Sequence, residues 1–130
     1  MADAIKINGG CYCGDITITG EVSSDKIMAC HCTDCQKFSG APYRAVAVIA
    51  ADAVKISGTV TEFLKIAESG NERLQGFCGK CGSHLYASDP AKTLFMIRTA
   101  CLDQHHELVP AKHIFGKSAV EWVGEIADSS

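Results

Sequence analysis

Eight cysteines in 130 residues are the side chains of this sequence with the greatest capacity for chemistry. Seven of them fall into three short groups: Cys11 and Cys13, then Cys30, Cys32 and Cys35, then Cys78 and Cys81. The first residues show no basic segment followed by an apolar run, so we expect no secretory signal and a reducing, cytoplasmic location. Under reducing conditions, clustered cysteines bind metals or do chemistry more often than they form disulfides.

The first and last groups share a pattern in which glycine follows two closely spaced cysteines, in residues 11–14 and 78–82. Glycine permits a sharp turn that points backbone amides at the sulfurs. Two such pairs supply the four thiolates of a closed, tetrahedral, structural zinc site. The alternative is two disulfides, but cysteines one residue apart on a strand fit disulfide geometry poorly. We therefore predict one structural zinc site that ties the N-terminal hairpin to the middle of the chain.

The middle group, residues 30–35, reads Cys-His-Cys-Thr-Asp-Cys and has no following glycine. Three cysteines leave a zinc ion one ligand short of a tetrahedron, and an open position distinguishes catalytic zinc sites from structural ones. Three thiolates also suit a soft thiol that ionises as it binds. We expect a second, more labile zinc ion here, with a substrate thiol as its fourth ligand. The alternative is that His31 or a remote side chain supplies the fourth ligand.

Four other side chains could contribute to a site or to the core. Cys101 ends an apolar strand and is expected to be buried and inert. His84 follows the second cysteine pair and its glycine, and is expected at the surface. His113 alternates with apolar residues and is expected to face solvent. Trp122 is expected to anchor the core or a subunit interface.

The elements that position these residues are mostly strands. Apolar alternation predicts them at residues 15–19, 26–29, 43–50, 54–56, 61–66, 73–77, 83–86 and 93–98. One short helix is expected over residues 34–39, with Thr33 as its N-cap and Gly40 ending it. Residues 118–123 fit a further helical turn or a last strand. Strands joined by short turns predict a mainly β, mostly antiparallel fold, in one domain over residues 1–130.

Composition excludes several classes of function. The net charge is −3 and no basic run is present, so we expect no nucleic-acid partner. The longest apolar run, residues 45–51, falls far short of the ~20 residues that a membrane helix needs, so no membrane partner is expected. The sequence is compatible with a monomer or an oligomer.

Together these motifs resemble the glutathione-dependent formaldehyde-activating enzyme family, also called the Gfa or CENP-V domain family. The resemblance covers about residues 5–123, and all seven motif cysteines occur in order. It is carried by residues 9–14, 30–42 and 76–83, and more weakly by 102–103 and 113–122.

This resemblance implies an Mss4-like fold of antiparallel sheets around a structural zinc, with one or two short helices. It implies that the structural ligands are Cys11, Cys13, Cys78 and Cys81, and that the catalytic zinc ligands are Cys30, Cys32 and Cys35. The activity implied is that of a carbon–sulfur lyase, which condenses formaldehyde with glutathione to S-hydroxymethylglutathione. Because glutathione is an anion, basic residues should receive its carboxylates, and the candidates are Lys37, Arg44, Arg73 and Arg98.

Two other functions compete with this one. A non-catalytic zinc-binding module that binds another macromolecule would need the zinc sites but no substrate. A methionine sulfoxide reductase of a related zinc fold would use two cysteine pairs and a late redox cysteine, a role that Cys101 could fill. That second function leaves the triple of Cys30, Cys32 and Cys35 without a purpose.

Overall fold

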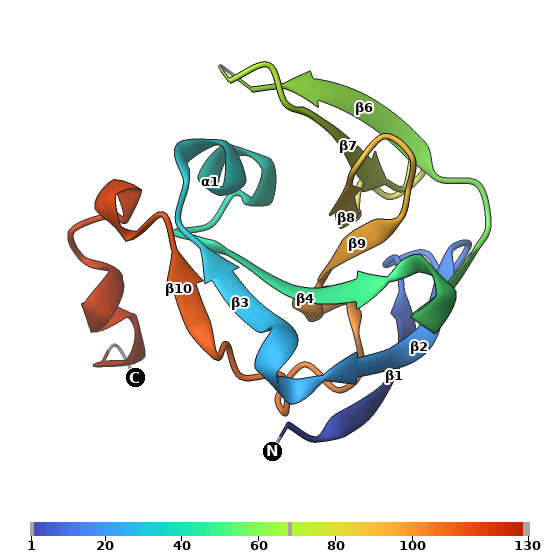
Figure 1. Cartoon of the computed structure of the whole chain (residues 1–130), viewed down its shortest axis with the longest axis horizontal. Helices are drawn as coiled ribbons and strands as arrows, with labels where there is room; N and C mark the ends of the chain where they lie inside the picture. Colours follow the sequence, from blue (N-terminus) through green and yellow to red (C-terminus); the bar gives the residue numbers. More distant parts are fainter. Residues whose placement is uncertain (1, 68, 129–130) are drawn as a thin grey trace.

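The computed structural model describes residues 2–67 and 69–128, which form ten strands, one α-helix and five short 3-10 helices (Figure 1). The strands are β1 (Ala4–Gly10), β2 (Thr17–Ser23), β3 (Ile27–Cys30), β4 (Arg44–Ala50), β5 (Val54–Ser57), β6 (Thr61–Ile66), β7 (Glu72–Phe77), β8 (His84–Ser88), β9 (Leu94–Arg98) and β10 (Lys112–Ile114). The α-helix is α1 (Thr33–Ser39). The 3-10 helices are Ser24–Lys26, Ala51–Ala53, Thr99–Cys101, Gly116–Ser118 and Val123–Asp128.

The strands form two sheets, and the predicted mainly β, mostly antiparallel fold is confirmed. A three-stranded sheet has the order β1-β2-β5, and a seven-stranded sheet has the order β10-β3-β4-β9-β8-β7-β6. The pairing of β10 with β3 is parallel, and the other strand pairs of the described chain are antiparallel. The larger sheet is strongly curved, with α1 on its concave side (Figure 1).

Strand alternation divides the larger sheet into a core face and a concave face. Ile27, Ala47 and Ile97 lie in register across β3, β4 and β9, and all three are buried in the core shared with the smaller sheet. Their neighbours of opposite parity, such as Met28 and Val46, point to the concave face. The same alternation that builds the core therefore places Cys30 and Arg44, another register pair, on the concave face.

The structure departs from the sequence predictions at several element ends. Strands β1 and β10 were not predicted, and β2 starts and ends later than residues 15–19. The N-cap of α1 is Cys32 rather than Thr33, because the Cys32 sulfur accepts the amide hydrogen of Cys35. Gly40 ends the helix as predicted, with a left-handed φ of 64°.

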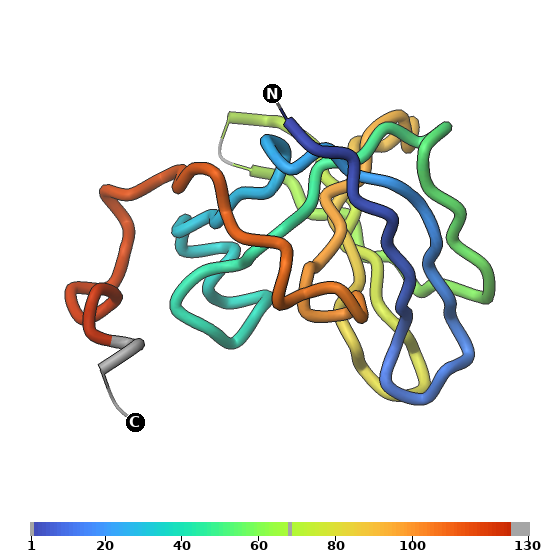
Figure 2. Tube along the Cα trace, turned by 90° about the horizontal axis from the view of Figure 1, so that it is seen from below, coloured from blue at the N-terminus to red at the C-terminus, as the bar shows by residue number. Residues whose placement is uncertain are grey.

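The C-terminal segment also differs from expectation. The single helical turn or strand expected over residues 118–123 does not form: Ser118 ends one 3-10 helix, Val123 begins the next, and residues 119–122 connect them. This segment, in red, extends away from the two sheets (Figure 2). Trp122 is 54% exposed there, so the expectation of a core anchor is wrong, and the alternative of a subunit-interface anchor stays a prediction. Among the described residues, no helix combines the length and apolar character needed to cross a membrane.

One close contact in the sheet depends on glycine. Gly76 pairs with Tyr86 on one side and Glu62 on the other, and the Tyr86 hydroxyl donates to Glu62 Oε2 at 2.7 Å. The Tyr86 ring crosses Gly76, where an added Cβ would lie 2.6 Å from Cε1 of the ring. The ring therefore occupies the space that a side chain at position 76 would need.

We predict that Gly76→Ala lowers the free energy of unfolding by about 1–3 kcal/mol, the usual cost of overpacking. Gly116→Ala is the matched control, because no atom outside its chain neighbours lies within 4 Å of the added Cβ. Urea unfolding of the two variants tests this, and equal midpoints for Gly76→Ala and the wild type would contradict it.

Candidate metal centres

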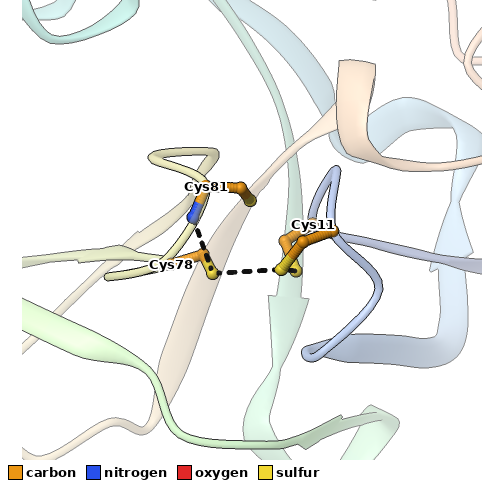
Figure 3. A group of neighbouring side chains, drawn as sticks. Cys11, Cys78 and Cys81 are labelled. Atoms are coloured by element: carbon orange, nitrogen blue, oxygen red, sulfur yellow. Dashed lines mark hydrogen bonds between the residues drawn. The ribbon is translucent and has the colours of Figure 1, made fainter.

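Two turns bring four cysteines together from distant parts of the chain. Cys11 and Cys13 lie between β1 and β2, and Cys78 and Cys81 lie between β7 and β8. Figure 3 shows Cys11 beside Cys78 and Cys81. Their sulfurs all lie within 4.8 Å of one another. The Cys11–Cys13 and Cys13–Cys78 sulfur separations are 3.6 and 3.7 Å. Zinc–sulfur bonds of about 2.3 Å give tetrahedron edges of about 3.8 Å, so the group can hold a metal ion of this size.

Backbone amides support these sulfurs. The Ile16 amide donates to the Cys11 sulfur at 3.3 Å, and the Cys81 amide donates to the Cys78 sulfur at 3.5 Å. Hydrogen bonds from Ser83 lower the pKa of Cys81 to about 5. The glycines that follow each pair, at positions 14 and 82, have φ of 86° and 81°, which L side chains rarely adopt. Backbone and Ser83 hydrogen bonds in the two turns therefore favour the thiolate forms of Cys11 and Cys81.

A second group forms at the junction of β3 and α1. Cys30 ends β3, Cys32 caps α1 and Cys35 lies in its first turn, and their sulfurs lie within 4.8 Å of one another. Among the described residues, no histidine or carboxylate joins this group. The Nε2 atom of His31 instead lies 2.8 Å from Nδ1 of His113 on β10. The group thus offers three ligands to a metal, and His31 is not the fourth.

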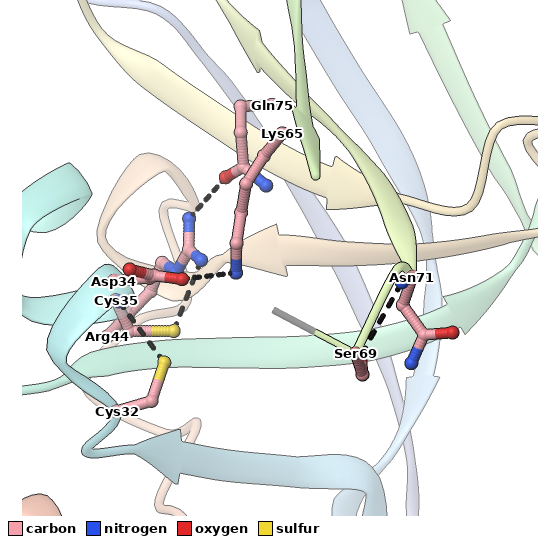
Figure 4. Close-up of polar contacts among 8 residues, drawn as sticks. All are labelled: Cys32, Asp34, Cys35, Arg44, Lys65, Ser69, Asn71 and Gln75. Carbon is pink, nitrogen blue, oxygen red and sulfur yellow. Dashed lines mark hydrogen bonds and ion pairs between the residues drawn. The ribbon is translucent and has the colours of Figure 1, made fainter. Parts of the chain in front are cut away.

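A buried arginine contacts this second group. Arg44 is 5% exposed, and its guanidinium donates to the Cys35 sulfur at 3.1 Å and to Gln75 Oε1 at 2.8 Å (Figure 4). The Phe38 ring lies under the guanidinium, 5.7 Å away. A hydrogen bond from Cys30 and the charge of Arg44 lower the pKa of Cys35 to about 5, against the opposing effect of burial. After the hydrogen bond with Cys30, the contact and charge of Arg44 therefore also favour the thiolate form of Cys35.

The three cysteines lie at one end of a cavity of about 710 Å³ on the concave face. Lys65 and Arg73, a register pair on β6 and β7, also line it. The Lys65 amine binds Asp34 Oδ2 at 2.8 Å (Figure 4). Arg73 donates to the carbonyl of Glu72. The same cavity is thus lined by the three thiols and by two basic side chains, Lys65 and Arg73.

His84, at the start of β8, was expected at the surface, and that expectation is wrong because its ring is turned inward and the residue is half-buried. Both ring nitrogens of His84 are buried and have no hydrogen-bond partner among the described residues. Burial, with the nearby charges of Arg44 and Arg98, lowers the pKa of His84 to about 4.

Cys101 donates its thiol hydrogen to the His84 carbonyl at 3.3 Å and belongs to neither cysteine group. Burial raises the pKa of Cys101, which keeps the thiol protonated and fits an inert role.

Comparison with known proteins identifies the family. Residues 6–118 match the family model of glutathione-dependent formaldehyde-activating enzymes, so the chain belongs to this family and the resemblance seen in the sequence is confirmed. A crystal structure of a Rhodobacter sphaeroides protein is similar to this structure with a TM-score of 0.61. It is 17% identical, with 82% of this chain and 98% of that chain covered, and shows a shared fold. The role of the chain is, at family level, glutathione-dependent activation of formaldehyde.

The contact of Arg44 with Cys35 yields a test. In metal-free protein, Arg44→Gln should move half-maximal alkylation of Cys35 by iodoacetamide to a pH about 1 to 3 higher, because a cation that favours the thiolate is lost. Peptide mapping after alkylation across a pH series measures this for Cys35 alone. Arg73→Gln is the control, since Arg73 lines the same cavity without contacting Cys35. An unchanged alkylation profile in Arg44→Gln would show that the arginine does not stabilise the thiolate.

Proposed function

We propose that this protein is a zinc-dependent carbon–sulfur lyase that forms and splits adducts of glutathione, such as S-hydroxymethylglutathione from formaldehyde. Cys30, Cys32 and Cys35 hold a catalytic zinc ion, and the other four clustered cysteines hold a structural one: Cys11, Cys13, Cys78 and Cys81. The observation that supports this division is the cavity, which reaches all three thiols of the first group. A non-catalytic zinc module would have no use for a cavity of this size beside one metal centre.

Thiolate donors suit zinc in both groups, since soft sulfur ligands select it over magnesium or calcium. When bound by the three cysteines, zinc supplies a Lewis acid with affinity for a thiol. In the reaction a sulfur–carbon bond forms, one carbonyl bond breaks, and the thiol proton ends on the carbonyl oxygen. The protein contributes chiefly by holding thiol and aldehyde together, because this addition is intrinsically easy. Arg44 offsets the negative charge of the thiolates.

Among the four basic residues considered from the sequence, Arg73 is the best placed to receive a glutathione carboxylate. Lys37 and Arg98 do not line the cavity of the three cysteines. Arg44 lines it, but its guanidinium already binds Cys35 and Gln75. Arg73 donates to a neighbouring backbone carbonyl through one nitrogen and keeps further N–H groups for a ligand.

The catalytic assignment can be tested by zinc titration with and without glutathione. Wild-type protein should bind two zinc ions, and glutathione should tighten the weaker one by about 5- to 150-fold, the usual range for coupled ligands. Cys32→Ser should lose this weaker site and its response to glutathione. Serine is the sharper substitution than alanine here, because its oxygen can still cap α1 where the Cys32 sulfur does. Identical titrations of both proteins, unaffected by glutathione, would refute the assignment.

The structural assignment predicts that Cys78→Ser loses one tightly bound zinc and melts at least about 10 °C lower, since a loss of a few kcal/mol moves the melting temperature that far in a small domain. Cys101→Ser is the matched control, because Cys101 belongs to neither group. Metal content by mass spectrometry and calorimetry decide the matter. A Cys78→Ser protein with unchanged zinc content and melting temperature would exclude a structural role.

A further inference from the structure

The cavity beside the three cysteines has one apolar side that formaldehyde cannot fill. Met28 and Val46 are a register pair on β3 and β4, and Met96 and Ala87 are a register pair on β9 and β8. All four side chains line the cavity on the concave face of the larger sheet. Met28 lies two residues from Cys30 on the same face of β3, so this apolar floor reaches the metal-binding thiols directly.

Apolar side chains also border the cysteines from the C-terminal part of the chain. Ile114 on β10 pairs with Cys30, and Phe115 follows it, and both line the cavity. The Phe115 side chain is 64% exposed. An apolar ligand lying between this ring and the floor would remove apolar surface from water on both sides, which stabilises binding.

The opposite side of the cavity is polar. It is formed by Lys65 at the end of β6, by Ser69 and Asn71 (Figure 4), and by Arg73 at the start of β7. These side chains offer charge and hydrogen bonds to the peptide and carboxylate groups of glutathione. The peptide and carboxylate groups of glutathione can therefore bind on the polar side of the cavity. Binding of glutathione alone leaves the apolar floor without a ligand group.

The volume supports the same division. A cavity of about 710 Å³ lies in the upper part of the range that holds drug-sized ligands. Formaldehyde adds only one carbon and one oxygen to the thiol that it joins. Two of the floor residues are methionines, whose flexible and polarizable side chains adapt to apolar groups of different shapes.

We infer that the site takes glutathione adducts of aldehydes that carry an apolar chain or ring, with the apolar group over Met28, Val46 and Met96. This rests on the proposed function and specifies its substrate class. The reaction is balanced as before: the thiol sulfur bonds to the aldehyde carbon, the carbonyl double bond becomes single, and the thiol proton moves to oxygen. No oxidant or reductant takes part.

Binding of S-alkylglutathiones tests this without any turnover, because a thioether does not release its alkyl group. Isothermal titration with S-methyl-, S-butyl- and S-hexylglutathione should show affinity rising about threefold to fourfold for each methylene that enters the cavity. Equal affinities for the methyl and hexyl compounds would overturn the inference. This series uses the wild-type protein, so its outcome does not depend on the folding of any variant.

Met96→Gln, which keeps the side-chain length but adds a polar amide, should reduce the preference for the hexyl compound and leave the methyl compound unaffected. Leu94→Gln is the control, since Leu94 is exposed on the same strand and does not line the cavity. Phe115→Ser, at an exposed position, serves as the second variant and should also weaken hexyl binding. An undiminished hexyl preference in both cavity variants would show that the alkyl group binds elsewhere.

Failure of this inference is distinguishable from failure of the proposed function. With zinc and glutathione, wild-type protein should accelerate the reaction of hexanal over its uncatalysed rate more than it accelerates that of formaldehyde. A greater acceleration with formaldehyde would overturn the inference and leave the lyase proposal intact. A zinc affinity that does not respond to glutathione would instead refute the lyase proposal, whatever the alkyl series shows.

Discussion

The four sulfurs between the two sheets impose the constraint on which the rest of the fold depends. One pair comes from the turn of the smaller sheet and the other from a turn of the larger sheet, with Cys13 and Cys78 separated by 65 positions. Although the Asp15 amide favours its thiolate, burial and the neighbouring sulfurs raise the pKa of Cys13 to about 12. Four thiolates so close together repel one another unless a cation lies among them. An ion at this point would therefore hold together the two layers that enclose the core.

The concave face can carry a site because the opposite face carries the core. Residues of one parity, such as Ile97, are fully buried between the sheets, and residues of the other parity line the cavity. Curvature of the sheet then brings β7 towards the end of β3, so that Gln75 reaches Arg44 and through it Cys35. A substitution that shifted the register of β3 against β4 by one residue would turn the core residues of β3 to the cavity and its cavity residues to the core.

The sequence alone allowed much of this to be predicted, because ligand spacing is a local property. Both cysteine groups follow from the positions of their members, and most strands follow from apolar alternation. The contact of Arg44 with Gln75 joins strands 31 residues apart and had no sequence signal. His84 was misplaced because its burial depends on the Phe38 ring stacked on it, 5.9 Å away, and on distant charges. Strand β10 is three residues long and is defined by its pairing with β3 rather than by its own pattern.

The two cysteine groups differ in how much of the chain must be folded before they exist. Cys30, Cys32 and Cys35 lie within six consecutive residues, so an unfolded or half-synthesised chain already presents all three thiols. An ion that binds the unfolded chain as well as the native one adds little to native stability. The other group is complete only after Cys81 has been made and both sheets have met. During synthesis the group of Cys30, Cys32 and Cys35 would therefore bind metal first. Only metal binding by the group that includes Cys78 and Cys81 would add to the stability of the native fold.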